Sequence, residues 1–228
     1  MNIIKTMDLF KVYQETKVPV YALNGITLTF EEAEFTAIVG PSGSGKTTLL
    51  NMLGGLDNPT SGEVHINGTN ITSLSSKKLI DFRLHNIGFV FQSFNLIPVL
   101  TARENVEFIL QLQGIGRKER QERAIELLEA VGLKDKVDNR PGDLSGGQQQ
   151  RIAVARALAS KPRFILADEP TANLDSHSTA DLLDIMEKMN LQYKTTFLFS
   201  THDSRVMERA RRIVTIEDGK VASDEIRH

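Results

Sequence analysis

A short stretch near the start of the chain combines glycine, lysine and threonine in a spacing suited to binding a polyphosphate. Its residues are Gly40, Pro41, Ser42, Gly43, Ser44, Gly45, Lys46, Thr47 and Thr48, which contain the full pattern G-x-x-x-x-G-K-[ST]. Glycines let the backbone wrap an anion, so that successive N–H groups and a helix N-terminus point at it. Lys46 can then reach the β- and γ-phosphates, and the Thr47 hydroxyl can ligate Mg²⁺. The stretch predicts a nucleoside-triphosphate site.

The residues on either side predict the elements that position this loop. An apolar, β-prone run at 35–39 precedes the loop, and apolar residues follow it at Leu49, Leu50 and Leu53, with Met52 beside them. The second group has helical spacing, so the segment reads as strand, glycine loop and helix. A glycine-rich turn that merely starts a helix is the alternative, but it gives no reason for the lysine and the threonine.

Two adjacent carboxylates follow another apolar run. Residues 164–167 are apolar and end at Asp168 and Glu169. An acidic residue at the carboxyl end of a buried strand beside a phosphate loop suits holding Mg²⁺ through water, and we predict this role for Asp168. Glu169 is predicted to orient and polarise the attacking water. A solvated acidic turn is the alternative, and the phosphate loop upstream disfavours it.

A third stretch, Ser145, Gly146, Gly147 and Gln148, opens a helix that continues through 152–158. A glycine-containing helix N-terminus makes a second anion site. One nucleotide needs only one phosphate loop, so a second phosphate-binding helix suggests a second subunit. The alternative, a helix that Ser145 merely caps, is disfavoured because glycine costs helix stability.

The whole chain of 228 residues suits a single α/β domain. Strands alternating with helices imply a mainly parallel sheet. We expect a nucleotide-binding core with a small N-terminal β region over 1–91 and 161–228, and a helical insertion over 92–160. The strands are expected at 3–4, 8–13, 26–30, 35–39, 63–66, 87–91, 164–168, 196–200 and 213–216. Helical faces are expected from Ala124, Leu127, Leu128 and Val131, and from Leu182, Ile185, Met186 and Met189.

Composition excludes several classes of protein. The chain has no cysteine, which rules out disulfides and thiolate chemistry, and its formal net charge of −2 gives no overall basic field for nucleic acid. The basic clusters at 117–118 and 209–212 are interpreted as solvated helix faces, so we expect no nucleic-acid partner. No apolar run approaches the roughly 18 residues of a membrane-spanning helix, and the N-terminus lacks the pattern of a signal peptide. Work at a membrane would therefore require a partner.

The stretch 144–148, taken with the phosphate loop, Gln92, the Asp168–Glu169 pair and His202, resembles the nucleotide-binding subunits of ABC transporters. The resemblance runs from Tyr13 to about Lys220, with every motif in family order. It implies a P-loop NTPase core of the RecA-like type, an N-terminal antiparallel β subdomain and a helical insertion that carries the ABC signature. ATP and Mg²⁺ are the implied cofactors. It also implies an ATP-sandwich dimer, in which the phosphate loop of one copy faces Ser145 and Gly147 of a second copy.

The resemblance also implies roles for single residues. Tyr13 matches the aromatic that stacks on adenine, with edge packing as the alternative. Gln92 matches the glutamine that contacts Mg²⁺ and the attacking water, and His202 matches the histidine that contacts the γ-phosphate. Asp175 matches the loop that crosses the dimer seam, although Ala172-Asn173 departs from the serine and alanine more usual there. The implied catalytic residues are Glu169, His202, Gln92 and Lys46, and the implied metal ligands are Thr47, Gln92 and Asp168. The nucleotide contacts are Tyr13, Gly40 to Thr48, Ser145 to Gln148, and Asp175.

Residues 53–62 and 91–101 look like the LolD/MacB branch, which pairs with FtsX-like permeases and acts on lipoproteins, peptides or drugs. We therefore expect a peripheral subunit at the cytoplasmic face of the inner (plasma) membrane, bound to an integral membrane permease. A groove near 94–100 is expected to receive a permease helix. A periplasmic adaptor or binding protein is a further partner that the resemblance leaves open. The alternatives are an amino-acid-type importer ATPase, a soluble non-transport ABC ATPase and a small-molecule kinase.

Overall fold

The computed structural model describes residues 2–14 and 18–227, which form two compact units. Unit 1 contains the chain up to Arg83 and from Thr196 onward, and unit 2 contains Leu84–Thr195. These bounds differ from the predicted division at 91/92 and 160/161, which stays a prediction. The difference arises because the strand at 164–168 pairs with the strand at 87–91, and the helix at 176–193 packs against the helix at 146–159.

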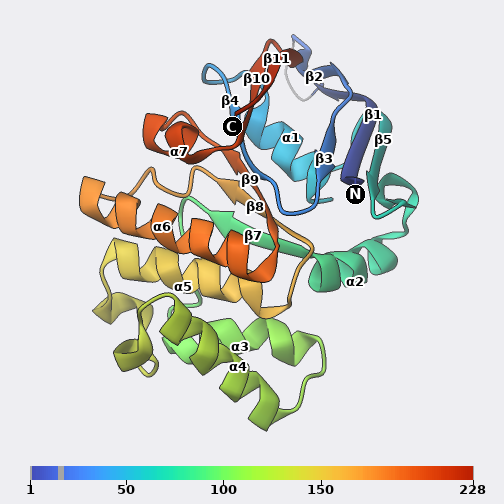
Figure 1. The fold of residues 1–228 in the computed structure, drawn as a ribbon. Helices are drawn as coiled ribbons and strands as arrows, with labels where there is room; N and C mark the ends of the chain where they lie inside the picture. Colours follow the sequence, from blue (N-terminus) through green and yellow to red (C-terminus); the bar gives the residue numbers. More distant parts are fainter. Residues whose placement is uncertain (1, 15–17, 228) are drawn as a thin grey trace. The chain divides into compact units, whose positions relative to one another are not determined.

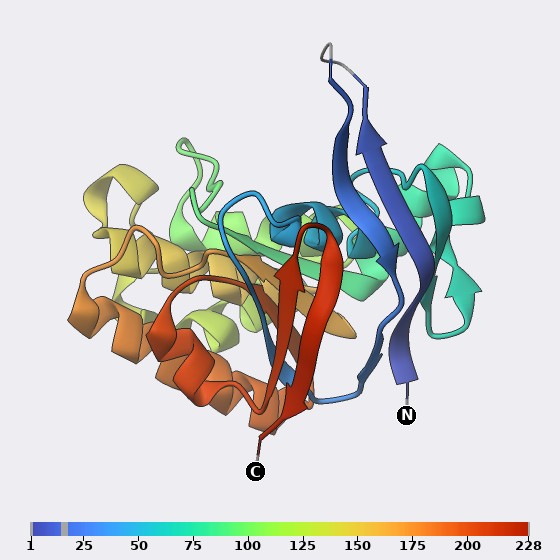
Figure 2. The ribbon, with the colours of Figure 1, turned by 90° about the horizontal axis from the view of Figure 1, so that it is seen from above.

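An antiparallel sheet forms the first part of unit 1. Its strands are β1 (Asn2–Tyr13), β2 (Val20–Ile26), β3 (Thr29–Glu31), β5 (Ser61–Ile66) and β6 (Thr69–Asn70). β1 pairs antiparallel with β2, β3 and β5, which confirms the predicted β subdomain, and Figure 2 shows β1 and β2 side by side. The sequence predicted two short strands where β1 is continuous. The two are joined because β1 has a bulge near Asp8, whose φ is 44°. The pairing of β1 with β5 shifts register there and then continues.

The second sheet segment of unit 1 is mainly parallel, as predicted. Its strands are β4 (Phe35–Val39), β9 (Thr196–Ser200), β10 (Arg212–Glu217) and β11 (Lys220–Ile226). β4 pairs parallel with both β9 and β10, and β11 adds an antiparallel edge. The rings of Phe35, Phe197 and Phe199 are fully buried here. This packing fixes the carboxyl ends of β4 and β9 at one edge of the sheet.

The helices of unit 1 are α1 (Lys46–Leu53), η1 (Ile71–Ser73) and α7 (Ser204–Arg209), while α2 (Ser76–Asn86) begins in unit 1 and ends in unit 2. The predicted apolar face of α1 is buried at Leu49, Leu50, Met52 and Leu53. The sequence missed α2, α7, β6, β11 and most of β2, and the single strand predicted over 26–30 is wrong, because β2 ends at Ile26 and β3 begins at Thr29. None of the residues of α2 is buried, so it lacks the apolar periodicity that indicates a helix.

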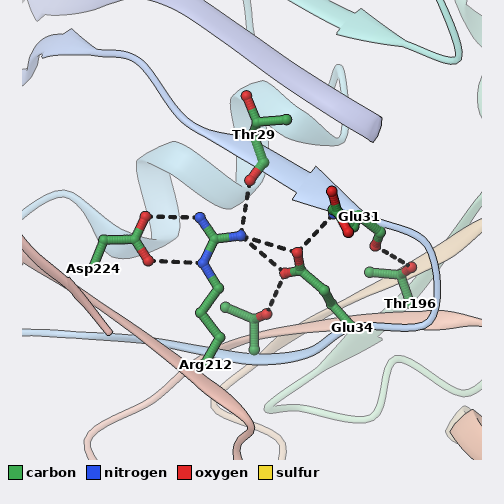
Figure 3. A network of polar contacts seen from close by, with 7 residues as sticks. Thr29, Glu31, Glu34, Thr196, Arg212 and Asp224 are labelled. Carbon is green, nitrogen blue, oxygen red and sulfur yellow. Dashed lines mark hydrogen bonds and ion pairs between the residues drawn. The ribbon is translucent and has the colours of Figure 1, made fainter. Parts of the chain in front are cut away.

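Arg212 joins three segments of unit 1, as Figure 3 shows. Its Nη1 donates to the Thr29 carbonyl oxygen at 2.8 Å and to both carboxylate oxygens of Glu34, and its Nε and Nη2 each donate to Asp224 at 2.7 Å. The paired carboxylate of Asp224 raises the pKa of Arg212. The prediction of a solvated helix face over 209–212 is therefore wrong for Arg212, because this residue lies in β10 and bonds across the sheet edge.

Unit 2 contains two parallel strands and a stack of helices. The strands are β7 (Ile87–Phe91) and β8 (Phe164–Asp168), both at their predicted bounds. The helices are α3 (Ala102–Leu112), α4 (Arg117–Ala130), η2 (Lys134–Lys136), η3 (Pro141–Asp143), α5 (Gly146–Ala159) and α6 (Ser176–Tyr193). α5 packs against β7, α6 and the α3–α4 pair, and Figure 1 shows these helices as successive layers.

The helical faces of unit 2 largely match the prediction. The four predicted apolar residues of the α4 segment are fully buried, and Gly132 ends that segment with a φ of 74°. On α6, Leu183 is buried and the predicted Ile185 is partly exposed. Within 2–14 and 18–227, no helix is long and apolar enough to cross a lipid bilayer.

Candidate functional site

The predicted site residues fall into two sets, one in each unit. Unit 1 holds Tyr13, the phosphate-loop stretch 40–48 and His202. Unit 2 holds Gln92, the stretch 145–148, the pair 168–169 and Asp175.

In unit 1, the phosphate loop leaves β4 and enters α1 through glycines in backbone conformations that other residues rarely adopt. Gly40, Gly43 and Gly45 have φ values of 145°, 79° and 106°. A Cβ at Gly40 would lie 2.0 Å from the Ile216 carbonyl oxygen, and one at Gly45 would lie 2.3 Å from the Ala22 carbonyl oxygen. Glycine is therefore required at both positions, because the loop passes directly against neighbouring backbone.

Two polar groups inside the loop are arranged for an anion. The ammonium of Lys46, a residue only 9% exposed, donates to the carbonyl oxygens of Gly40 and Pro41, each at 2.9 Å. Ser44 Oγ is buried and has no hydrogen-bond partner among the described residues. In the part of the chain that the structure describes, no side chain caps the N-terminus of α1. A buried cation held by dipoles and an unsatisfied hydroxyl beside a helix N-terminus form a cradle that fits phosphate groups.

His202 lies at the same sheet edge as the phosphate loop. β4 and β9 are parallel, with Ile38 paired to Ser200, so the loop and His202 both follow the carboxyl ends of neighbouring strands. The Thr201 amide donates to the Ile38 carbonyl oxygen at 3.1 Å. His202 itself is exposed. Unit 1 thus brings the predicted γ-phosphate contact and the phosphate loop to one edge of the sheet.

Tyr13, at the end of β1, is held by a polar cluster. Its hydroxyl donates to Asp57 Oδ2 at 3.0 Å, and Lys11 Nζ donates to Asp57 Oδ1 at 2.8 Å. The Lys11 ammonium also lies 4.8 Å from the centroid of the Tyr13 ring. Burial alone would raise the pKa of Asp57, but the hydrogen bonds from Lys11, the Asn58 amide and Tyr13 together lower this pKa below its ordinary value. Asp57 is a site residue that the sequence did not reveal.

In unit 2, Gln92 and Glu169 follow paired positions on neighbouring strands. β7 and β8 are parallel, with Phe91 opposite Asp168. Gln92 therefore follows β7 and Glu169 follows β8 at the same edge of the sheet. These are the two residues predicted to contact the attacking water. Glu169 has a φ of 45°, a left-handed conformation that strains a non-glycine residue and that is common at functional sites.

Ser145 caps α5, as in the alternative that the glycines of this stretch disfavoured. The Gln148 amide donates to Ser145 Oγ at 3.3 Å, and the Ser145 amide donates to Gln148 Oε1 at 2.9 Å, which completes a capping box. Gly147 has a packing reason, because a Cβ there would lie 2.9 Å from Ser178 Oγ. A Cβ at Gly146 would meet its nearest neighbour at 3.6 Å, an ordinary contact. Packing within the cassette therefore does not require a glycine at 146, and the absence of a side chain leaves the backbone at the start of α5 accessible.

Asp175 is the N-cap of α6. Its carboxylate accepts hydrogen bonds from the Ser178 amide at 2.9 Å and from Ser178 Oγ at 2.7 Å. These hydrogen bonds, first among them the one from the Ser178 amide, lower the pKa of Asp175. Because Ser178 also packs against Gly147, the predicted seam loop and the start of α5 are joined through one serine.

Three further residues that the sequence did not reveal hold the site segments of unit 2. Gln150 and Arg156 both lie on α5. Gln150 donates to the carbonyl oxygen of Phe91 at the end of β7, and Arg156 donates to that of Phe94 in the segment that follows. Asn173 donates to the carbonyl oxygen of Gln92. One signal was available for Gln150. It lies three, four and seven residues before buried Ala153, Val154 and Ala157, which places a glutamine on an apolar helix face.

Comparison with known proteins identifies the family. Residues 23–172 match the family model described as ABC transporter. The chain belongs to the ABC transporter family. It is an ATP-binding and ATP-hydrolysing cassette, which confirms the predicted enzyme class and the predicted P-loop NTPase fold.

Relatives of this ABC cassette are similar over almost its whole length. An ABC transporter ATP-binding protein of Thermotoga maritima is 47% identical over 99% of the chain and 96% of its own length. The macrolide export ATP-binding/permease protein MacB of Hyphomonas neptunium is 47% identical over 97% of the chain, and the chain spans 34% of that longer protein. This similarity confirms the predicted relation to the LolD/MacB branch.

A solved structure has the same fold as this ABC cassette. The ATP-binding cassette MJ0796 of Methanocaldococcus jannaschii was solved as a dimer in a post-hydrolysis state, bound to ADP and Pi. It matches with a TM-score of 0.91 and 42% identity over 99% of both chains.

Proposed function

We propose that this ABC cassette dimerises around two ATP molecules and drives a separate FtsX-like membrane permease of the MacB type. The observation that carries the proposal is the 47% identity to the MacB relative, whose name joins an ATP-binding part and a permease in one protein. In this chain the same cassette would act on a permease from the cytoplasmic face of the inner membrane, as a peripheral subunit. A periplasmic adaptor or binding protein is a further candidate partner.

The residues of the site fit ATP and Mg²⁺. The glycine loop, the Lys46 ammonium and the unsatisfied Ser44 hydroxyl form an anion cradle. The proposed metal ligands are Thr47, Gln92 and Asp168, which offer a hydroxyl, an amide oxygen and a carboxylate. These are the oxygen ligands that Mg²⁺ prefers. When bound, Mg²⁺ would neutralise charge on the β- and γ-phosphate oxygens.

The proposed reaction is in-line transfer of the γ-phosphoryl group to water. The water oxygen bonds to the γ-phosphorus while the bond from that phosphorus to the β–γ bridging oxygen breaks, giving ADP and Pi. Glu169 orients the water and accepts its proton, and Gln92 helps to hold the water. Lys46 and His202 bind the phosphate oxygens, where charge must be stabilised in the transition state.

The second copy would complete the nucleotide site through the start of α5. Helix N-termini favour anions, and Ser145, Gly147 and Gln148 lie at the N-terminus of α5. The small Gly146 would let a phosphate approach the backbone closely, and Asp175 would lie in the loop at the seam. The dimeric MJ0796 relative, at 42% identity, supports this assembly.

Tyr13 is proposed to stack on adenine. Tyr13→Ala should raise the Kd for ATP about tenfold, because base–aromatic stacking contributes about 1–3 kcal/mol. The Kd for inorganic tripolyphosphate should not change. Asp57→Asn should give a smaller increase, about threefold, because the ring stays but loses its anchor. Binding is measured by calorimetry, with Tyr21→Ala as the control, since Tyr21 is a 64% exposed tyrosine on the adjacent strand. An unchanged Kd for ATP in Tyr13→Ala would leave edge packing as the role of this ring.

The permease partner can be identified by affinity purification. Tagged Glu169→Gln cassette would be purified with ATP from detergent-solubilised membranes, and the bound proteins identified by mass spectrometry. We expect a permease with few spans and a large extracytoplasmic domain. A many-span permease with a solute-binding protein would instead identify an importer. Recovery of soluble proteins alone would contradict a transport function.

The segment 94–100 supplies the matched control for this purification. Asn105 fixes this segment by accepting from the Ile97 amide at 2.8 Å and donating to the carbonyl oxygens of Ile97 and Leu100. The side chain of Val99 is left 69% exposed on it. Adding Val99→Asp to the tagged Glu169→Gln cassette should therefore remove the permease from the purified material without changing ATP binding. Recovery of the permease with Val99→Asp would place docking elsewhere.

A further inference from the structure

Gln150 bonds the backbone beside both residues assigned to the attacking water. It is fully buried on α5, five residues after Ser145. Its Nε2 donates to the Pro170 carbonyl oxygen at 2.8 Å and to the Phe91 carbonyl oxygen at 3.3 Å. Pro170 follows Glu169 and Phe91 precedes Gln92, so a single amide group is bonded next to each.

Burial of the side chain alone does not explain a glutamine at this position. The two N–H bonds of the amide are both used, but its Oε1 is buried without a hydrogen-bond partner among the described residues. A buried polar atom without a partner destabilises the folded state. An apolar side chain of similar length would suit this otherwise apolar face of α5, but it would leave the carbonyl oxygens of Phe91 and Pro170 without this donor. The two donated bonds are therefore the reason for the residue.

The segment after β7 is restrained from the same helix and from the seam loop. Asn173 Nδ2 donates to the Gln92 carbonyl oxygen at 2.9 Å. Arg156 Nη2 donates to the Phe94 carbonyl oxygen at 2.8 Å, and its Nη1 donates to that of Asn95. Phe94 and Asn95 both have left-handed backbones, with φ values of 59° and 51°. A strained segment needs such restraints to keep one conformation.

We propose that Gln150 is a positioning residue that ties α5 to the backbone of Glu169 and Gln92, so that contact of a second copy with Ser145 sets both residues at once. Asn173 is proposed as a second tie to Gln92, from the loop that carries Asp175. Both assignments rest on the proposed roles of Glu169, Gln92 and the dimer. Gln150 is fully buried and Asn173 bonds the backbone of Gln92, so each is proposed to act on turnover and not on ATP binding.

The first test is Gln150→Met, which keeps the length of the side chain and removes its donors. We expect kcat for ATP to fall about tenfold, because a small displacement of reacting groups has large rate effects. The Kd for ATP should stay within about twofold. The unfolding temperature should fall only slightly, since the donors lost to two carbonyl oxygens are partly offset by removal of the unpartnered Oε1. The control is Gln113→Met, because Gln113 Nε2 donates to the Leu84 carbonyl oxygen at 3.0 Å in the same unit, away from the site segments. Its kcat should match that of the wild type.

The second test, Asn173→Asp, does not touch the core. Asn173 is exposed, and aspartate has the same shape but no donor for the Gln92 carbonyl oxygen. We expect kcat to fall about threefold at an unchanged Kd for ATP. This variant tests the second tie to Gln92 on its own, whether or not Gln150→Met folds. A wild-type kcat in either variant, or a weakened ATP affinity that accounts for the loss, would overturn the positioning role of that residue.

Glu169→Gln, measured in parallel, separates the two levels of the proposal. Arrest of Glu169→Gln together with a wild-type kcat in both positioning variants would contradict the positioning roles alone. Wild-type turnover by Glu169→Gln would contradict the proposed chemistry itself.

Discussion

Glu169→Gln is expected to lower kcat for ATP hydrolysis by about 100-fold or more, while the Kd for ATP should stay close to that of the wild type. Glutamine keeps the size of the side chain and its place after β8, but it cannot accept a proton from water. A general base contributes about 10²- to 10⁴-fold to a rate, so the loss should be large. Phosphate release under saturating ATP measures kcat, and calorimetry measures binding.

The matched control for this change is Glu122→Gln. Glu122 lies on α4 in the same unit, and its side chain is 68% exposed. The same chemical substitution there should leave kcat unchanged. If Glu169→Gln turns over at the wild-type rate, the water is activated by another group, and the strained backbone at Glu169 has a different purpose.

Lys46→Ala is expected to weaken ATP binding about 100-fold, which corresponds to about 2.7 kcal/mol. The ammonium is buried in the loop and already faces two carbonyl oxygens. A phosphate oxygen is a stronger partner for a buried cation than these dipoles are, because a full negative charge attracts the ammonium more strongly than a carbonyl dipole does. Alanine leaves the glycine backbone in place but removes this charge. Calorimetric titration with ATP gives the Kd.

Lys78→Ala is the control for the loss of one lysine, because Lys78 is exposed on α2 in unit 1. The Kd for ATP should be that of the wild type. Equal affinities for ATP in Lys46→Ala and the wild type would contradict the assignment of the phosphate loop.

The sequence predicted the parts of the site that depend on local residue types. The phosphate loop was readable because glycines, lysine and threonine are needed there in order. Strands β4, β7, β8 and β9 were predicted at their observed bounds because each is a short apolar run that ends at polar residues. The α2 and β11 segments carry few buried residues, so their sequences contain little periodic signal.

The contacts that hold the site could not be predicted, because they join residues far apart in the chain. Tyr13 and Asp57 are 44 positions apart, Gln150 and Phe91 are 59 apart, and Asn173 and Gln92 are 81 apart. In each case a side chain meets a partner that only the folded chain brings near. The capping by Ser145 was disfavoured for a related reason. The cost of glycine at 147 is offset by its close approach to Ser178, which lies on another helix.

The central claim, that ATP closes two copies around shared nucleotide sites, is tested most directly by the mass of the Glu169→Gln cassette in solution. Light scattering after gel filtration should give the monomer mass of 25.4 kDa without nucleotide and with ADP, and twice that mass with ATP. The dimer should be absent when Lys46→Ala is added. A monomer at saturating ATP, or a dimer whose mass does not depend on the nucleotide, would contradict the account.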